Sequence, residues 1–426
     1  MARRYLSMIL GKAVKKAAKL RGGGSALPGL VVEKIDPKFL SRTLQQLPLG
    51  VVIISGTNGK TTTTKIVVEL LESAGLKVFT NKTGSNFSRG VAAALLDEID
   101  IRGRIKSDIA VLELDEAWAA RFVQQVKPRF SLLLNVLRDQ LDRFGEIDAT
   151  ARLLDKIAQT TTDTVVFNRD DPRIFAISKA ISAKAKFFGT TSELLQLMPT
   201  DESLRTKDTA ANNTVKADVL LKKLVDNQAI FEIDDQEYQT SLSLTGVYNT
   251  FNAAAALSLV RQILKSAEVT ADNDKIIDTL SKIKPAFGRG ETITLDGQPI
   301  ELVLVKNPSG FRLALVSFPQ NNTPTMIAIN DNYADGRDMS WLWDVDFDSL
   351  KSGGVAQISG IRAYDMALRL QYDQVSFDTV ETNLSLALKK FLKRFPDQPK
   401  RIYCTYTAMT ALRRELAKLT KIEGIS

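Results

Sequence analysis

Lys60 and Thr61 stand where a short glycine turn meets the start of a helix, and residues of these types at this place bind phosphate. A run of β-branched residues precedes the turn, as in a buried parallel strand, and a helical apolar pattern follows it. Gly56 and Gly59 would let backbone N–H groups close around phosphate oxygens at the positive end of the helix. Lys60 would neutralise phosphate charge and the Thr61 hydroxyl would ligate Mg²⁺, so this segment predicts a nucleoside triphosphate site.

The turn has the tight form of such a loop, because Ile54 stands where the longer form has its first glycine. We expect the loop to lie at the surface, with its lysine reaching the ligand. The alternative is an ordinary strand-turn-helix unit with a solvated lysine, which the hydroxyls and both flanking elements disfavour. The residues predicted to bind the nucleotide from this loop are Gly56, Thr57, Asn58, Gly59, Lys60, Thr61 and Thr62.

Carboxylates stand at the end of another apolar run, residues 108–116. Glu113 at the carboxyl end of this strand would supply a hard oxygen ligand for Mg²⁺, with Asp115 or Glu116 as the alternative ligand. A solvated acidic turn remains a further alternative. Because ligands of open α/β sheets bind at the carboxyl ends of the strands, Lys60, Glu113, Asn135 and Asn168 should converge on one crevice.

Composition narrows the chemistry further. The 426 residues include no histidine, so a Ser-His-Asp or Cys-His site within this chain is excluded. A single cysteine, Cys404, excludes an internal disulfide and any cysteine-based zinc site, and suits the cytoplasm. Catalysis must use carboxylates, Lys, Arg and Mg²⁺, or take a histidine from a partner. No apolar run approaches the roughly 20 residues of a membrane span.

The net charge of +8 is concentrated at the start of the chain, where seven basic residues precede the first acidic one. Residues 1–24 are expected to form a basic helical segment, with Leu6, Ile9, Leu10 and Val14 at helical spacing. Such a helix would lie on anionic lipid or pack on the next domain, and packing is the interpretation we favour. No nucleic-acid-binding signature accompanies the charge.

Alternating strands and helices from residue 51 predict a doubly wound α/β fold with a parallel sheet. We expect three parts: a basic helical segment at 1–48, an ATP-binding domain at 49–292 and a second α/β domain at 293–426. The alternation is lost at about 190–235, which reads as an insertion or a flexible excursion.

Six motifs in order and spacing resemble the Mur ligase superfamily, whose members activate a carboxylate with ATP and then join it to an amine. In chain order these motifs are residues 56–62, Glu113, Asn135 with Asp139, residues 168–171, Gly246 with Tyr248, Asn249 and Asn252, and residues 288–291. The resemblance implies a central Mur-type ATPase domain and covers most of residues 50–426.

Two stretches narrow the resemblance to the MurT family of ligase subunits. Gln140 stands where muropeptide ligases usually have histidine, and residues 330–344 are similar to the C-terminal signature of MurT. These ligases pair with a GatD-type glutaminase and amidate the α-carboxyl of D-glutamate in the stem peptide of lipid II. The resemblance thus implies ATP, Mg²⁺, a glutaminase partner in a heterodimer, a lipid II substrate, and a place in the cytoplasm at the inner face of the membrane.

The resemblance also implies roles for single residues. Lys60 and Glu113 would act in the ligase reaction. Asn249 and Asn252 would lie by the nucleotide base, and Arg289 would stabilise charge during phosphoryl transfer. Asp338 would complete a catalytic triad in trans by orienting the histidine of the glutaminase.

Two departures from the family pattern stand out. Many MurT chains carry a four-cysteine zinc ribbon, but residues 190–230 contain no cysteine, so zinc is not expected. The usual ribose-binding aspartate is not evident, since residues 303–308 occupy the comparable stretch. The alternative functions are a stand-alone muropeptide or folylpolyglutamate-type ligase, and a nucleotide-binding scaffold without turnover.

Overall fold

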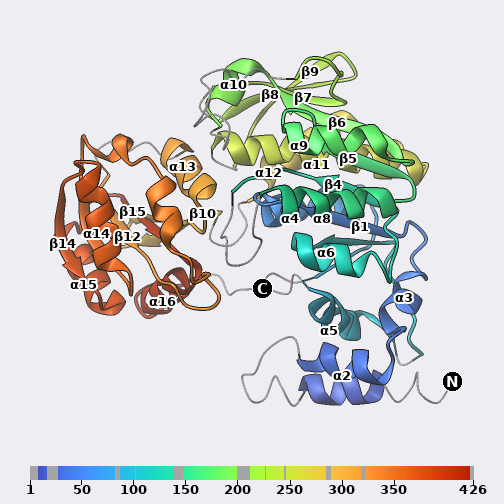
Figure 1. The fold of residues 1–426 in the computed structure, drawn as a ribbon, viewed down its shortest axis with the longest axis horizontal. Coiled ribbons are helices and arrows are strands. Elements are labelled where there is room, and N and C mark those ends of the chain that lie inside the picture. The colour runs from blue at the N-terminus through green and yellow to red at the C-terminus, as the bar shows by residue number, and fades with distance from the viewer. Residues whose placement is uncertain are drawn as a thin grey trace.

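The computed structural model describes residues 8–16, 27–81, 87–100, 102–138, 147–198, 212–225, 227–243, 246–284, 289–317 and 323–422. Two β-sheets, each covered by helices, stand beside each other in Figure 1, the central one in blue to yellow and the C-terminal one in orange to red. The α/β class predicted from the sequence is confirmed.

The central sheet has nine strands in the order β2-β3-β1-β4-β5-β6-β7-β8-β9. Every described pairing from β2 to β7 is parallel, and β8 and β9 continue the sheet in antiparallel fashion. The strand bounds are β1 Val51–Ser55, β2 Val78–Thr80, β3 Ile109–Glu113, β4 Phe130–Leu133, β5 Thr164–Asn168, β6 Lys184–Thr190, β7 Val219–Val225, β8 Gln228–Ile233 and β9 Gln236–Ser241.

Helices cover both faces of this sheet. Side chains of β1 alternate between two cores: Val52 and Ile54 face one, Val51 and Ile53 the other. All five residues of β1 are buried, which explains its continuous apolar run. The face of the sheet with Val52 and Ile54 is covered by α4 Lys60–Ser73, α10 Ser192–Gln196, α11 Val247–Ser266 and α12 Asn273–Lys282. The face with Val51 and Ile53 is covered by α5 Ser88–Glu98, α6 Glu116–Phe122, α8 Ile147–Thr160 and α9 Pro172–Ile177. The short helix η1 Ser178–Ala180 follows α9.

The stretch 190–235, expected to be an insertion or excursion, contributes to the main sheet where it is described. β7 pairs with β6 in parallel, and β8 then turns back along β7. From β7 to β9 the alternation of strands and helices is lost because these three strands form a meander, which needs no crossover helices. Residues 199–211 of this stretch lie outside the described part.

The C-terminal sheet has six strands in the order β10-β11-β15-β12-β13-β14, and only β10 is antiparallel to its neighbour. β10 begins at Arg289, so the boundary expected between residues 292 and 293 falls inside this strand. The bounds are β10 Arg289–Leu295, β11 Gln298–Leu304, β12 Thr325–Ala328, β13 Val355–Ser359, β14 Phe377–Glu381, β15 Lys400–Cys404, α13 Pro308–Ser317, η2 Ser340–Asp344, η3 Asp348–Leu350, α14 Ala363–Tyr372, α15 Leu384–Arg394 and α16 Tyr406–Leu416.

Three helical pieces precede β1: residues 8–16, α2 Leu27–Ile35 and α3 Phe39–Leu44. The first packs closely, since a Cβ at Gly11 would lie 2.5 Å from Val32. Packing on the next domain, the interpretation favoured from the sequence, is therefore what the described residues show. The helix packs through Met8 and Gly11, however, and leaves Ile9 exposed. Among the described residues, every helix is too short or too polar to cross a bilayer.

Candidate active site

The loop between β1 and α4 is shaped by two glycines that stand in the positive-φ region. Gly56 has φ +135° and Gly59 has φ +89°, a conformation that L side chains rarely adopt. Space also demands glycine, because a Cβ at Gly59 would lie 2.4 Å from Oδ1 of Asn252 on α11. The predicted nucleotide residue Asn252 thus lies directly against the loop, and its buried Nδ2 has no hydrogen-bond partner among the described residues.

Lys60 is buried, contrary to the expectation of a surface-placed loop. Its side chain turns back over the loop, where Nζ donates to the Gly56 carbonyl at 2.7 Å. Two acids stand close to the same ammonium, with Asp115 at 3.2 Å and Glu116 at 3.5 Å. Because Glu116 is almost fully buried, it depends on Lys60 for charge compensation. Lys60, predicted to bind phosphate, is therefore coupled to the start of α6.

Thr61 and Glu113 meet beside this lysine. The Thr61 hydroxyl donates to Glu113 Oε1 at 2.8 Å, although the two residues come from different elements, α4 and β3. Asn81 fixes the backbone of Glu113 through two bonds of 2.9 Å, one to its N–H and one to its carbonyl. A hydroxyl and a carboxylate at the mouth of a phosphate loop are the hard oxygen ligands that Mg²⁺ takes alongside phosphates and water.

Metal binding here would depend on those other ligands. Within the described residues, no group of three or more acidic, cysteine or histidine side chains is arranged to hold a metal ion. Thr61 and Glu113 fit an ion that keeps several waters and reaches the site with a triphosphate.

Asn135, which follows β4, fixes the loop from the neighbouring strand. The N–H of Asn58 donates to Asn135 Oδ1 at 2.9 Å, and Asn135 Nδ2 donates back to the Asn58 carbonyl at 3.0 Å. The same Nδ2 donates to the Tyr248 hydroxyl at 2.6 Å, which connects the loop to the first turn of α11. Asn249 occupies that turn as well. Asn135 thus joins the crevice predicted at the strand ends.

Asn168 has a supporting position instead. Its Nδ2 donates to the Leu134 carbonyl at 2.9 Å, which holds the ends of β4 and β5 together. Asp171 follows and caps α9 by accepting from the N–H groups of Arg173 and Ile174. Its second oxygen accepts from the Val136 N–H at 2.7 Å. Burial raises the pKa of Asp171 to about 6, although the three N–H donors oppose this shift.

The C-terminal domain contributes two residues whose role the motif comparison did not predict. Asn307 and the loop residue Asn58 exchange amide hydrogen bonds of 3.1 and 3.4 Å. Lys306 Nζ donates to the Thr57 carbonyl at 3.3 Å. Asn307 Oδ1 also accepts from the Gly310 N–H at 2.7 Å in the first turn of α13. The signal in the sequence was a lysine-asparagine-proline run directly after an apolar strand, where a ligand-binding edge is expected.

An ion pair connects the two domains nearby. Arg138 lies 3.1 Å from the Asp344 carboxylate at the end of η2, and Arg312 of α13 donates to the Asp344 carbonyl at 2.8 Å. The loop after β4, α13 and η2 therefore meet at Asp344.

Asp338, the predicted triad member, lies in the segment leading to η2. It is half-buried and accepts from the N–H and hydroxyl of Ser340 at 2.9 and 2.6 Å. Asp335 has a different setting: it is buried and accepts from both the N–H and the hydroxyl of Thr407 at the start of α16. Burial raises the pKa of Asp335. Asp335 thus serves as a helix cap, whereas Asp338 stays nearer the surface.

Some predicted residues fall outside the part of the chain that the structure describes. They include Leu6 of the basic segment, Asp139 and the side chain of Arg289. Thr62 is described and is buried in the first turn of α4. Thr57 is described too, and its hydroxyl bonds to the backbone of Leu137.

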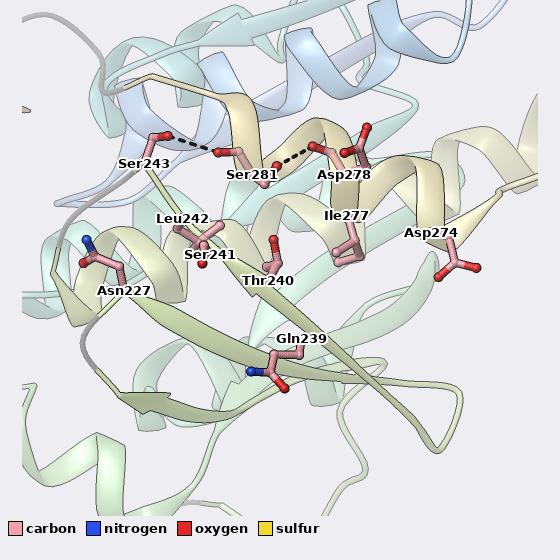
Figure 2. A pocket seen from close by; sticks show the side chains of 10 residues that line it. All are labelled: Asn227, Gln239, Thr240, Ser241, Leu242, Ser243, Asp274, Ile277, Asp278 and Ser281. Atoms are coloured by element: carbon pink, nitrogen blue, oxygen red, sulfur yellow. Dashed lines mark hydrogen bonds between the residues drawn. The ribbon is translucent and has the colours of Figure 1, made fainter.

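A separate hollow of about 800 Å³ lies between β9 and α12 (Figure 2). Hydroxyl, amide and carboxylate side chains line it, and Figure 2 shows Ser243 and Ser281 bonded to backbone carbonyls of α12. It contains none of the predicted site residues and lies at the outer edge of the sheet. We therefore place the chemistry at the loop after β1.

Comparisons with known proteins show which family the chain resembles. Residues 54–260 match the family model of the Mur ligase middle domain, and residues 304–409 match that of the MurT ligase C-terminal domain. The chain is 31% identical over 447 residues to the lipid II isoglutaminyl synthase (glutamine-hydrolyzing) subunit MurT of Streptococcus pneumoniae, covering 97% of this chain and 96% of that protein. The corresponding subunit of Staphylococcus aureus is 28% identical over 88% of this chain and 89% of its own.

Solved structures show the same fold. MurF from Acinetobacter baumannii superposes with a TM-score of 0.68 at 18% identity, over 92% of this chain and 80% of that one. MurF from Thermotoga maritima, solved in complex with ADP, gives a TM-score of 0.66 at 18% identity, over 92% and 85%.

Proposed function

The chain belongs to the MurT family of Mur-type ligases and is an ATP-dependent ligase, and from this membership we propose the reaction that it performs. It amidates the α-carboxyl of D-glutamate in the stem peptide of lipid II, a step of peptidoglycan biosynthesis. The carboxylate is activated as an acyl phosphate, and ammonia from a glutaminase partner displaces the phosphate.

The observation that carries this proposal is the arrangement of Lys60, Thr61 and Glu113 at the mouth of the glycine loop. A buried ammonium lies beside a hydroxyl–carboxylate pair, all at the carboxyl edge of a parallel sheet. This set suits a triphosphate that carries Mg²⁺, and the ion when bound would neutralise charge that develops on the transferred phosphoryl group.

The side chains of this chain would then divide the work of phosphoryl transfer. The N–H groups of the loop and Lys60 hold the phosphates, while Thr61 and Glu113 hold the metal. Asn252 lies against Gly59 of the loop, and with Asn249 of the same helix α11 it would position the base. Lys306, from the C-terminal domain, adds a second positive charge at the Thr57 carbonyl and would help to close the site over the phosphates.

The bond changes balance with ATP and ammonia alone. A carboxylate oxygen of the D-glutamate attacks the γ-phosphorus, and ADP leaves. The nitrogen of ammonia then bonds to the acyl carbon, the bond from that carbon to the phosphate oxygen breaks, and the nitrogen releases a proton as the neutral amide forms. No histidine is required within this chain, in keeping with its composition.

The C-terminal domain offers a surface suited to the glutaminase. Exposed apolar side chains recur at helical spacing along α14, at Tyr364, Leu368 and Tyr372, and Ile361 just before the helix is exposed as well. The Trp343 ring lies 5.1 Å from that of Tyr372, so these exposed side chains continue onto η2, which follows Asp338. An exposed aromatic surface of this kind is typical of protein interfaces. A partner bound there would bring its own histidine close to Asp338.

The choice of nitrogen donor tests the proposal. We would assay the chain together with a glutaminase on lipid II and ATP, supplying glutamine, ammonia or free amino acids in turn. Product from glutamine and from ammonia, and none from amino acids, is the expected result. Incorporation of an amino acid would show a stand-alone ligase instead, and ATP binding without any product would show a scaffold.

A further inference from the structure

The net positive charge of this protein comes from its first 50 residues. They contain ten Lys or Arg and two Asp or Glu, a net charge of +8, which is also the net charge of the whole chain. The rest of the chain is therefore electrically balanced. Charge segregated in this way marks a surface for a polyanionic partner rather than a general property of the protein.

The described part of this region is a layer of helices, which we call the N-terminal layer: residues 8–16, α2 and α3. In Figure 1 the helix of residues 8–16 and α2 lie at the lower end of the molecule, beyond α5. Lys12 and Lys15 hold residues 8–16 to α5 by donating to the carbonyls of Ile99 at 2.8 Å and Ala93 at 2.5 Å. The layer is thus fixed to the sheet domain.

This attachment turns apolar side chains outward. The helix is bound through Gly11 and its lysines, so Ile9 is 65% exposed and Leu10 is 39% exposed. Leu27 at the start of α2 is 53% exposed. Part of the apolar stripe predicted from the sequence, Ile9 and Leu10, therefore faces outward.

Basic side chains accompany these apolar ones. Lys16 at the end of the first helix is exposed, as are Lys34 at the end of α2 and Lys38 just before α3. Glu33 and Asp36, the two acids of the region, are paired with Arg89 and Arg42. The exposed residues of the layer thus include apolar and cationic groups, whereas its two acids are paired with arginines.

We propose that the N-terminal layer binds the surface of a bilayer that contains anionic lipid, with Ile9, Leu10 and Leu27 entering the interface and Lys16, Lys34 and Lys38 at the headgroups. Exposed apolar residues beside lysines on short helices have the composition of interfacial binding elements. A soluble polyanion would use the lysines and gain nothing from the exposed leucines and isoleucine. This inference rests on the proposed function, since a lipid-linked substrate is held at such a surface.

The test is flotation of the full chain, alone and with its glutaminase, on vesicles of phosphatidylcholine with and without phosphatidylglycerol. We expect binding only with the anionic lipid, and loss of binding in high salt. Lys34→Gln with Lys38→Gln should weaken binding about 25-fold, since each lysine near an anionic surface strengthens it about fivefold. Lys389→Gln with Lys393→Gln, on exposed positions of α15, is the matched control and should bind as the parent does.

Apolar insertion is tested separately by Ile9→Ser with Leu10→Ser, matched by Leu386→Ser with Leu419→Ser in the C-terminal domain. The first pair should reduce binding to anionic vesicles at least tenfold and the second should not. Equal binding to both vesicle types, no binding at all, or unchanged binding of the N-terminal variants would overturn the proposal. So would a dimer that Ile9→Ser with Leu10→Ser converts to monomer, because the surface would then face a second copy.

Amidation of a lipid II substrate in detergent micelles separates this inference from the proposed function. The N-terminal variants should keep parental activity there, because micelles need no bilayer docking. Parental activity in micelles with no vesicle binding by the parent chain would remove the docking surface and leave the amidation reaction intact. Vesicle binding with no amidation would refute the proposed reaction and leave the docking surface intact.

Discussion

Lys60 shows how a residue predicted for its chemistry can also be part of the structure. Its ammonium lies among loop carbonyls and two acids, one of which is almost fully buried. Removing the lysine would therefore remove the proposed phosphate ligand and would also leave the charge of the buried Glu116 carboxylate uncompensated. Activity and stability must be measured together at this position.

Lys60→Ala should lower the rate of amidation by about 100- to 1,000-fold, the usual effect of losing one preorganised electrostatic group at a transition state. Lys65→Ala is the matched control, since Lys65 lies on the same helix and pairs with Glu69 at 3.3 Å, away from the loop. Steady-state rates and thermal unfolding of both variants separate a loss of activity from a loss of stability. A rate near that of the parent for a folded Lys60→Ala protein would refute the phosphate-loop assignment.

Asp171 gives a prediction about pH. Burial raises its pKa in the folded state to about 6, above the value of roughly 3.9 in an unfolded chain. Between these two pH values the folded protein binds more protons than the unfolded one. The contribution of Asp171 to the free energy of unfolding therefore falls as the pH rises from about 4 to about 6. Against Asp171→Asn, which does not titrate, the parent should lose about 1.4 kcal/mol of relative unfolding free energy per pH unit from about 4 to 6.

Denaturant unfolding at several pH values measures this difference. A parent that gains relative stability as pH rises would show that the N–H donors of Val136, Arg173 and Ile174 outweigh burial, and that the pKa is lowered instead.

At the scale of elements, the loop after β1 is completed by α13 of the other domain. Asn307 caps the first turn of α13 and also exchanges hydrogen bonds with Asn58 of the loop. A single side chain thereby connects the position of the C-terminal domain to the shape of the phosphate-binding loop.

Asn307→Ala should therefore lower kcat/KM for ATP roughly tenfold, because it leaves a buried loop amide without its partner. Asn383→Ala is the matched control: Asn383 caps α15 in the same domain by accepting from the Leu386 N–H at 3.0 Å. Each variant should lose about 1 kcal/mol of stability as a helix cap is removed, and only Asn307→Ala should lose activity. If the two variants were equally active, the contact between Asn307 and Asn58 would have no role in the reaction.

The sequence predicted these elements unevenly, and for physical reasons. β1, β3, β4 and β5 were evident because strands buried on both faces are continuous apolar runs. The meander β7 to β9 was not, since polar residues alternate along strands with one solvated face and resemble a loop. β10 was missed at the domain boundary, where Arg289 and Glu291 give no apolar signal.

The residues of the candidate active site were also predicted unevenly from the sequence. Lys60, Thr61 and Glu113 were identified because their spacing follows one local strand-turn-helix unit and the next strand. Asn307 and Tyr248 join the loop across long stretches of chain, and no local pattern reports such a contact. These contacts arise from tertiary packing, which the spacing of residues in the sequence does not predict.

The proposed function separates two tasks within the molecule. We propose the ligase chemistry at the loop after β1, whereas Asp338 lies in the C-terminal domain, in the segment that leads to η2 and its exposed Trp343. If Asp338 orients a histidine of the partner, its loss should affect glutamine hydrolysis and leave amide formation from free ammonia.

Asp338→Asn in the complex should lower glutamine-driven amidation by about 10,000-fold, as when an aspartate no longer orients a catalytic histidine. Added ammonia should restore most of the rate. Asp344→Asn is a useful comparison, since it breaks the ion pair to Arg138 between the domains and should affect both nitrogen sources alike. Failure of ammonia to rescue folded, partner-bound Asp338→Asn would assign this aspartate to the ligase site or to the fold.

The central claim is that the substrate carboxylate is activated as an acyl phosphate, and isotope transfer tests it most directly. We would label the α-carboxyl of the D-glutamate in lipid II with the heavy isotope of oxygen and supply ATP, Mg²⁺ and ammonia. The released phosphate is then analysed by mass spectrometry. One labelled oxygen in phosphate for each amide formed is the predicted result, whereas amide formation with unlabelled phosphate would contradict it.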